Sequence, residues 1–141
     1  MSIPRFHLAF PVHDLGEARK FYSKILGCIT GRESQSWIDF NLYGHQIVAH
    51  LSPKDCNPSN TNSVDNDDIP CRHFGVILEW VDWESLKEKI KKLDYPFLVE
   101  PKIRFKSKHG EQGTFFINDP SGNALEFKTF KHDSMVFEKF E

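Results

Sequence analysis

The sequence lacks the features of a membrane, secreted or disulfide-stapled protein. No apolar run approaches the ~18–20 residues needed to cross a bilayer, and the start has no signal-peptide-like apolar stretch. Cysteine is scarce: Cys28, Cys56 and Cys71 are odd in number and form no Cys-x-x-Cys pair. That pattern is typical of free thiols in a reducing compartment, so we expect a cytoplasmic protein.

An excess of charge of one sign is also lacking. The chain has 18 Lys and Arg against 20 Asp and Glu, a formal net charge of −2. No strong field therefore draws it to nucleic acid or to anionic lipid, and we expect neither as a partner. What is present is phenylalanine, 13 in 141 residues, which favours a thick aromatic core or an apolar cavity.

The same order of elements occurs twice along the chain. Residues 4–12 predict a strand, 14–27 an amphipathic helix, and 36–43 with 46–51 a pair of strands. After a polar segment the plan returns, with a strand from Cys71, a helix capped by Asp82 and three further strands. Two copies of one unit at this separation indicate an internal duplication.

This repeat predicts an α+β fold made of two strand-helix-strand-strand-strand modules. The strands are expected to form one curved mixed sheet, a cup, with the helices on its outer face. The 141 residues suit one domain, which we divide into module one (about 1–52), a linker (about 53–70), module two (about 71–130) and an amphipathic tail (131–141).

Strand alternation separates four chemistry-bearing residues from the apolar face. Successive strand residues point to opposite sides of a sheet. We expect the helices to cover the side that carries the apolar residues, and the other side to be free of helices. His7, His50, His73 and Glu126 all fall on this helix-free face. A lone strand histidine is more often a hydrogen-bonded surface or core residue than a ligand. Two imidazoles and a carboxylate together nevertheless suit a divalent metal, iron(II) first, with zinc, nickel or manganese as alternatives.

Three aromatic residues and one basic loop are candidates for substrate binding. Trp37, Tyr43 and Phe116 fall on the helix-free face by the same alternation and predict an aromatic-lined pocket; a sheet face covered by loops is the alternative. The loop 102–113 carries Arg104, which could hold a substrate carboxylate or phosphate, although a solvated basic loop has the same appearance.

Three segments resemble the vicinal oxygen chelate superfamily, which includes glyoxalase I, extradiol dioxygenases, fosfomycin resistance proteins and bleomycin resistance proteins. They are FHLAFPVHDLGEARKFYSKILG near the start, RHFGVILEW in the middle and the closing DPSGNALEF. The resemblance implies paired βαβββ modules around a metal cup. It also implies that His7, His73 and Glu126 are the metal ligands, as in the two-histidine, one-carboxylate set of extradiol dioxygenases.

Two departures from the family pattern bear on the activity. Glyoxalase-type members add a fourth ligand, usually glutamate, where this chain has His50; aligning the hairpin glycines instead sets Val48 opposite Glu126. His50 is therefore a candidate fourth ligand or general base. Many extradiol dioxygenases carry a substrate-contacting tyrosine where this chain has Phe116.

The resemblance, together with the ligand pattern, implies a metal-dependent enzyme acting on a small oxygen-chelating organic substrate, dioxygenase-like slightly before glyoxalase-like. One alternative is a metal-free, dimeric small-molecule-sequestering protein of the bleomycin resistance kind. Another is an interaction protein that docks through its tail, by way of Met135, Val136, Phe137 and Phe140. A homodimer and the identity of the substrate stay open.

Overall fold

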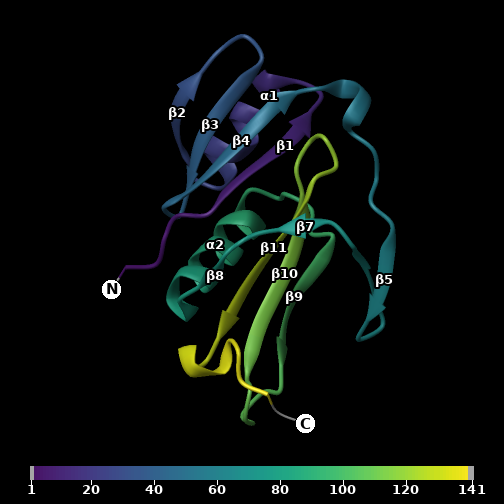
Figure 1. The fold of residues 1–141 in the computed structure, drawn as a ribbon. Helices are drawn as coiled ribbons and strands as arrows, with labels where there is room; N and C mark the ends of the chain where they lie inside the picture. Colours follow the sequence, from purple (N-terminus) through teal and green to yellow (C-terminus); the bar gives the residue numbers. More distant parts are fainter. Residues whose placement is uncertain (1, 140–141) are drawn as a thin grey trace. The chain divides into compact units, whose positions relative to one another are not determined.

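The chain divides into two compact units in the computed structural model, which describes residues 2–139 (Figure 1). The first unit holds the residues up to 59 together with the turn 119–123, and the second holds 60–118 and 124 onward. Each unit contains one strand-helix-strand-strand-strand module. The α+β fold class is confirmed, with curved sheets that do not close. The strands of the two modules form a four-stranded and a five-stranded sheet in place of the single sheet expected, because hydrogen bonding between strands stays within each module.

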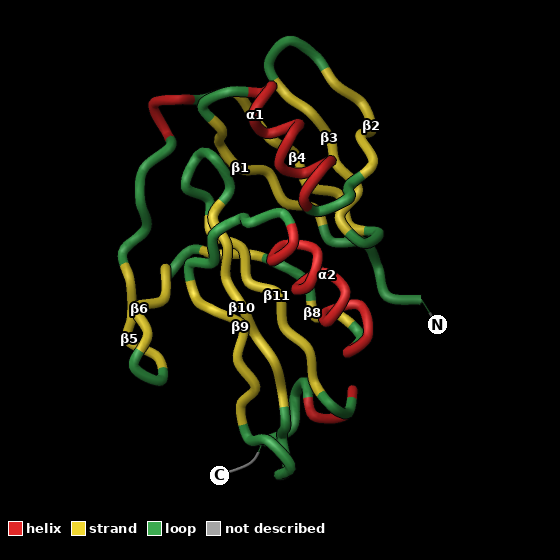
Figure 2. The backbone as a smooth tube through the Cα atoms, turned by 180° about the vertical axis from the view of Figure 1, so that it is seen from behind, coloured by secondary structure: helices red, strands yellow, loops and turns green. Residues whose placement is uncertain are grey.

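The first unit is a four-stranded sheet with a helix on one face (Figure 2). The strand order is β1-β4-β3-β2, with β1 parallel to β4 and the other pairs antiparallel. Its elements are β1 (His7–Val12), α1 (Leu15–Lys20), the π-helical η1 (Phe21–Ile25), β2 (Ile29–Glu33), β3 (Trp37–Leu42), β4 (His45–Leu51) and the 3-10 turn η2 (Pro53–Asp55).

The first helix forms for the reasons that its sequence predicts. The Asp14 carboxylate accepts the backbone N–H of Glu17 at 2.8 Å, as an N-cap should, and Gly27 follows the helix with a φ of 73°. The buried Tyr22 ring packs against Phe10 and Phe40, with ring centroids 5.4 and 5.1 Å away. The helix thus covers the face that carries Phe10 and Phe40, as the alternation predicts for these two residues.

The turn 119–123 is held in the first unit by the buried carboxylate of Asp119. This group accepts the Tyr22 hydroxyl at 2.7 Å and the side-chain amide of Asn123 at 2.8 Å. The amide of Asn123 also donates to the carbonyl of Pro11 at 2.8 Å. In the same turn the Ser121 hydroxyl lies 2.7 Å from Nδ1 of His13. The turn formed by the Asp-Pro-Ser-Gly-Asn sequence therefore joins the first strand and the first helical segment of this unit through side-chain hydrogen bonds.

The second unit repeats the plan around a five-stranded sheet, with β11 parallel to β7 and β8 and antiparallel to β10, and β10 antiparallel to β9. Figure 2 shows α2 lying against β11 and β8. Its elements are β7 (His73–Phe74), β8 (Ile77–Leu78), α2 (Trp80–Lys92), β9 (Val99–Arg104), β10 (Gln112–Asn118) and β11 (Ala124–Phe130).

Two predictions for the start of this unit are wrong in detail. The strand expected from Cys71 is split into β7 and β8 at Gly75, where a Cβ atom would lie 1.6 Å from the carbonyl oxygen of Glu126. The helix begins at Trp80, with Glu79 at the N-cap position and without a side-chain capping hydrogen bond, so Asp82 lies in the first turn. The chain enters α2 directly from β8, and Asp82 complements the helix dipole there without capping it.

The predicted linker is wrong over part of its length, because it contains a hairpin of β5 (Thr61–Val64) and β6 (Asp67–Pro70). Asp65 and Asn66 form its turn with φ values of 47° and 69°, which these two residue types tolerate well. Asp67 pairs with Lys102 of β9, and Asp65 pairs with Arg104 at 2.7 Å.

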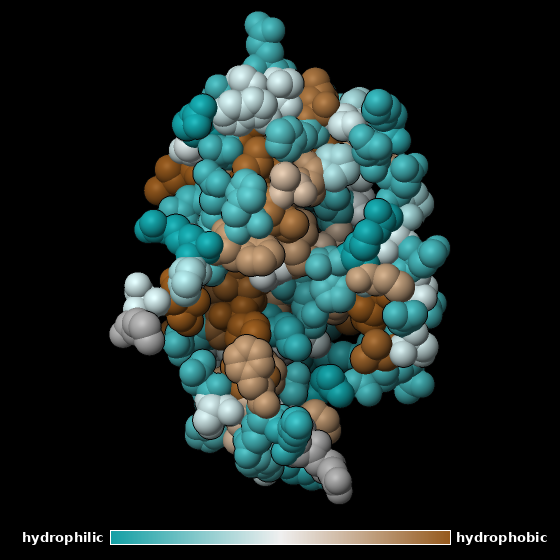
Figure 3. Space-filling view, in the orientation of Figure 1, coloured by the Kyte–Doolittle hydropathy of each residue, from teal (hydrophilic) through white to brown (hydrophobic). Residues whose placement is uncertain are grey.

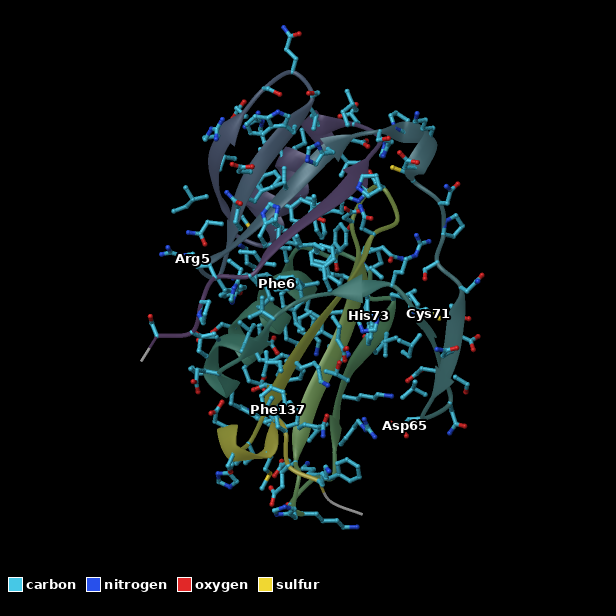
Figure 4. The ribbon with its side chains drawn as sticks, viewed as in Figure 1. Arg5, Phe6, Asp65, Cys71, His73 and Phe137 are labelled. Carbon is cyan, nitrogen blue, oxygen red and sulfur yellow. The ribbon has the colours of Figure 1, made fainter. Side chains whose placement is uncertain are left out.

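The tail packs on the second unit. It forms a 3-10 turn, η3 (Asp133–Met135), and the buried Met135 sulfur lies 3.1 Å from the backbone nitrogen of Gly110. Glu138 pairs with His109 at 3.0 Å. Phe137 is 94% exposed and is labelled in Figure 4, whereas Phe140 lies outside the described residues.

The surface is mixed in character. In Figure 3 the hydrophobic residues form brown patches interrupted by teal polar side chains. The three cysteines are free thiols, with Cys28 buried and Cys71 exposed. Within residues 2–139, no helix has the length and apolar character that crossing a membrane requires.

Candidate metal site

His7 lies on the helix-free face of the first sheet with its ring orientation fixed by neighbours. Its Nδ1 lies 2.8 Å from Oε1 of Gln46, the residue opposite it on β4. The Gln46 amide nitrogen in turn donates to the Asp39 carboxylate at 3.4 Å. Because a carboxylate only accepts, the Gln46 oxygen must face His7, and Nδ1 of His7 must carry the proton. The lone pair of His7 is therefore on Nε2.

His73 has the same tautomer in the second unit. Its Nδ1 lies 2.7 Å from the carbonyl oxygen of Pro70, which can only accept, so Nδ1 is again the protonated nitrogen. Its Nε2 lies 3.2 Å from Oε1 of Glu126, and Figure 4 labels His73 at the start of this sheet. Two electron-pair donors that face each other at this distance suit a cation that binds both, whether a proton or a metal ion.

Glu126 is anchored through its other oxygen. The Thr114 hydroxyl of β10 donates to Oε2 at 2.6 Å, which leaves Oε1 toward His73. The Glu126 side chain is only 17% exposed. Phe116 stands directly opposite Glu126 in the sheet and packs edge-on against His73 with centroids 5.1 Å apart. The Phe116 ring therefore borders the His73–Glu126 pair on one side.

These residue types fit a divalent metal, and the structure brings two of the three predicted ligands together. His73 and Glu126 are neighbours in the second unit, and His7 belongs to the first unit. Among residues 2–139, no cluster of three His, Cys, Asp or Glu side chains is close enough to hold a metal ion. In each predicted ligand a neighbouring group nevertheless holds one polar atom, the arrangement that orients metal ligands in proteins.

The register separates His50 from the counterpart of Glu126. In the parallel pairs, His7 stands opposite Gln46 and His73 opposite Ala124, so the residue of the first module that corresponds to Glu126 is Val48. His50 lies on the same face, two residues beyond Val48. It is four residues from Gln46, which is about 13 Å at a strand rise of about 3.3 Å per residue. It is exposed, and its catalytic role stays a prediction.

The predicted substrate-binding residues have different surroundings. Trp37 is opposite His50 on the helix-free face and carries the Arg32 guanidinium 5.4 Å from its ring centre. Tyr43 has left the strand: it has a φ of 50° in the β3–β4 turn and lines a small hollow with Leu26. The alternation that placed Tyr43 in the pocket ends at the residue before it.

Arg104 is paired with a carboxylate in this structure, and its role in substrate binding stays a prediction. Its guanidinium lies 2.7 Å from the Asp65 carboxylate and 5.0 Å from the centre of the Phe105 ring. The partner comes from the β5–β6 hairpin, about forty residues earlier in the chain, so no local sequence signal around Arg104 could have revealed the pairing.

The supporting residues were not predicted. Gln46, Asp39 and the carbonyl of Pro70 hold the two histidines, and Thr114 holds Glu126. Alternation alone would have put Thr114 on the side of Phe116, because they are two residues apart on one strand. The contacts of Gln46 and Pro70 depend on strand register and on a turn, which alternation does not specify.

The comparison with family models decides the family. Residues 6–127 match the model of the Glyoxalase/Bleomycin resistance protein/Dioxygenase superfamily. The chain belongs to this superfamily. The resemblance found in the sequence is thereby confirmed over most of the chain.

Solved structures of the superfamily share the fold over nearly the whole chain. A glyoxalase/bleomycin resistance protein/dioxygenase from Alicyclobacillus acidocaldarius is 35% identical, with a TM-score of 0.79 over 95% of this chain and 96% of that one. The fosfomycin resistance protein FosX of Listeria monocytogenes is 17% identical, with a TM-score of 0.67 over 96% and 98%. A lactoylglutathione lyase from Agrobacterium tumefaciens is 14% identical, with a TM-score of 0.63 over 96% and 97%. A search of curated protein sequences found no significant match.

Proposed function

We propose that this superfamily member is a divalent-metal-dependent enzyme that acts on a small oxygen-chelating organic substrate, with His7, His73 and Glu126 as the metal ligands. The observation that carries the proposal is the anchoring of all three side chains. Nδ1 of His7 is held by Gln46 and Nδ1 of His73 by the Pro70 carbonyl, which leaves Nε2 of each histidine as an electron-pair donor. Oε2 of Glu126 is held by Thr114, which leaves Oε1 as the donor. A bound metal would act as a Lewis acid on the substrate oxygens.

The ligand set favours oxygen chemistry over isomerisation. In a four-ligand, glyoxalase-like site the first module would supply a ligand at or near the register counterpart of Glu126, and that counterpart is the buried Val48. Two histidines and one carboxylate suit iron(II), with zinc, nickel or manganese as the alternatives. His50, on the face that carries His7, is the proposed proton acceptor, since an imidazole nitrogen can accept a proton as a general base.

His7 belongs to the first unit, and His73 and Glu126 belong to the second, so two arrangements of the proposed ligands are to be distinguished. One chain could supply all three ligands, or a homodimer could combine His7 of one copy with His73 and Glu126 of the other. Mixing the inactive variants His7→Ala and His73→Ala distinguishes these cases, because recovered activity requires a site shared between chains. The free thiols support a cytoplasmic location.

Metal analysis of protein purified without added metal tests the proposal. We expect about one metal ion per site in the wild type and a large loss in His73→Ala and Glu126→Gln. His132→Ala is the matched control, since His132 is an exposed histidine of the tail. Iron would favour a dioxygenase, and zinc or nickel an isomerase. Equal, negligible metal in all four proteins, even after incubation with each metal, would leave the metal-free sequestering protein as the better reading.

A further inference from the structure

A hollow with polar and apolar lining lies on the helix-free face of the first sheet, beside His7. Its volume is about 380 Å³, within the range of small-molecule sites. Gln46 lines it and holds the His7 ring. Arg5, just before β1 (Figure 4), and Arg32, on β2, contribute two guanidinium groups to the same lining.

The guanidinium groups of Arg5 and Arg32 differ from those of Arg19 and Arg104 in their ion pairing. Arg19 pairs with Glu33 at 2.6 Å and Arg104 with Asp65 at 2.7 Å. Among residues 2–139, neither Arg5 nor Arg32 has a carboxylate within ion-pair distance. Both are exposed, so their donors are open to a ligand.

Two polar side chains of the remaining lining, His45 and Asn41, also offer donors. Nδ1 of His45 accepts the backbone N–H of Phe6 at 2.9 Å, so a neutral His45 carries its proton on Nε2. Oδ1 of Asn41 accepts the backbone N–H of Gly44 at 2.7 Å, which leaves its amide N–H groups. Asp39 supplies the one carboxylate, and Gln46 donates to it.

A set of donors with two arginines selects a ligand with anionic oxygens, because a guanidinium binds a carboxylate or phosphate through two parallel hydrogen bonds. Arg32 is also pre-positioned, since its guanidinium lies over the Trp37 ring and loses less freedom when it binds.

We infer that the hollow between Arg5, Arg32 and His45 binds the anionic group, carboxylate or phosphate, of a small-molecule ligand. Taken with the metal site, on which this part rests, it identifies the substrate class as a small organic acid whose chelating oxygens lie near His7 while its acid group lies on the two arginines. Trp37 then serves as the support of Arg32.

Titration of metal-free protein with inorganic phosphate, and in parallel with acetate, at constant ionic strength tests the inference. We expect saturable 1H–15N NMR shifts of the Arg5 and Arg32 side-chain N–H groups and of the Trp37 indole. Losing a hydrogen bond to a charged group weakens binding by roughly tenfold or more, so we expect that effect from Arg5→Gln and from Arg32→Gln. Arg104→Gln, which removes a paired guanidinium, should bind as the wild type does.

The two anions report which acid group the hollow prefers. Non-saturable shifts with both anions, or equal binding by the Arg5→Gln/Arg32→Gln double variant, would overturn the inference. Metal content is measured on the same variants: normal metal with lost phosphate binding separates this site from the metal site. Retained phosphate binding in a chain that takes up no metal would sink the proposed enzyme and leave the anion site standing.

Discussion

At the scale of single residues, the Thr114 hydroxyl decides how the Glu126 carboxylate is presented. Thr114→Val keeps the shape of the side chain and removes the hydrogen bond to Oε2. Loss of such a supporting contact typically lowers metal affinity by roughly 10–100-fold, and we expect a loss of that size. Competition with a chelator of known affinity measures it.

Thr129→Val is the matched control for this change. Thr129 is also a buried strand threonine, but its hydroxyl donates to the carbonyl of Leu78 at 2.8 Å. Its loss should lower the free energy of unfolding by roughly 1–2 kcal/mol and leave metal affinity unchanged. Equal metal affinity in Thr114→Val and the wild type would contradict the assigned role of Thr114.

Burial and the neighbouring turn 119–123 both lower the expected reactivity of the Cys56 thiol toward alkylating reagents. Burial raises the pKa of Cys56 above its ordinary value, and the nearby Asp119 carboxylate raises it further. Less thiolate is then present at pH 8 than in an ordinary cysteine, and the thiolate is the reactive form. We expect iodoacetamide to alkylate Cys56 more slowly than the exposed Cys71, with a rate that still rises above pH 9. Site-resolved mass spectrometry would contradict this by finding Cys56 labelled first.

At the scale of elements, the break between β7 and β8 is enforced by the approach of Gly75 to β11. A Cβ atom there would lie 1.6 Å from the carbonyl oxygen of Glu126, so Gly75→Ala must push the strands apart. We expect a loss of roughly 3 kcal/mol in the free energy of unfolding, measured by urea denaturation. Gly31→Ala is the control, because its Cβ would meet only Asp39 at 3.4 Å and should cost within about 0.5 kcal/mol.

The tail offers a second comparison between neighbouring residues. Met135 is buried and Phe137 is 94% exposed. Met135→Ala should lower the free energy of unfolding by about 2 kcal/mol because it removes packed apolar volume, whereas Phe137→Ala should change it by less than about 0.5 kcal/mol. Thermal unfolding of both variants tests this. A destabilisation by Phe137→Ala that depends on protein concentration would indicate that the tail docks a partner chain.

How far the sequence predicts these elements depends on how local the signal is. Alternation placed His7, His73 and Glu126 on the correct faces because side-chain direction is a property of one strand. The break at Gly75 was not predicted, since it results from the backbone of a strand some fifty residues later. The β5–β6 hairpin was missed because its strands are short, polar and exposed, although Asp65-Asn66 is a recognisable turn signal.

At the scale of the whole molecule, the two modules keep one backbone plan and have different chemistry. Both pair their first strand with their last in parallel, in matching register. At the matching position, one module has the carboxylate of Glu126 and the other has the apolar Val48. The sequence repeat predicts the order of elements in both modules. It leaves two alignments of the last strands, and the register shows that Val48 is the position equivalent to Glu126.

A fragment of residues 1–59 tests whether the first module is autonomous. It lacks the turn 119–123, so the buried Tyr22 loses the Asp119 carboxylate that accepts its hydroxyl, and Pro11 loses the amide of Asn123. We expect the fragment to lack the cooperative thermal transition of the full chain. Addition of a peptide of residues 117–125 in excess should restore part of it, and a fully cooperative fragment on its own would contradict this role of the turn.

The same turn bears on the order of events during synthesis. The first module is complete only when residues 119–123 have left the ribosome, although all of its strands and its helix emerge within the first sixty residues. Nascent chains of intermediate length should therefore expose Tyr22 and its neighbours, and they are the species on which a chaperone would act.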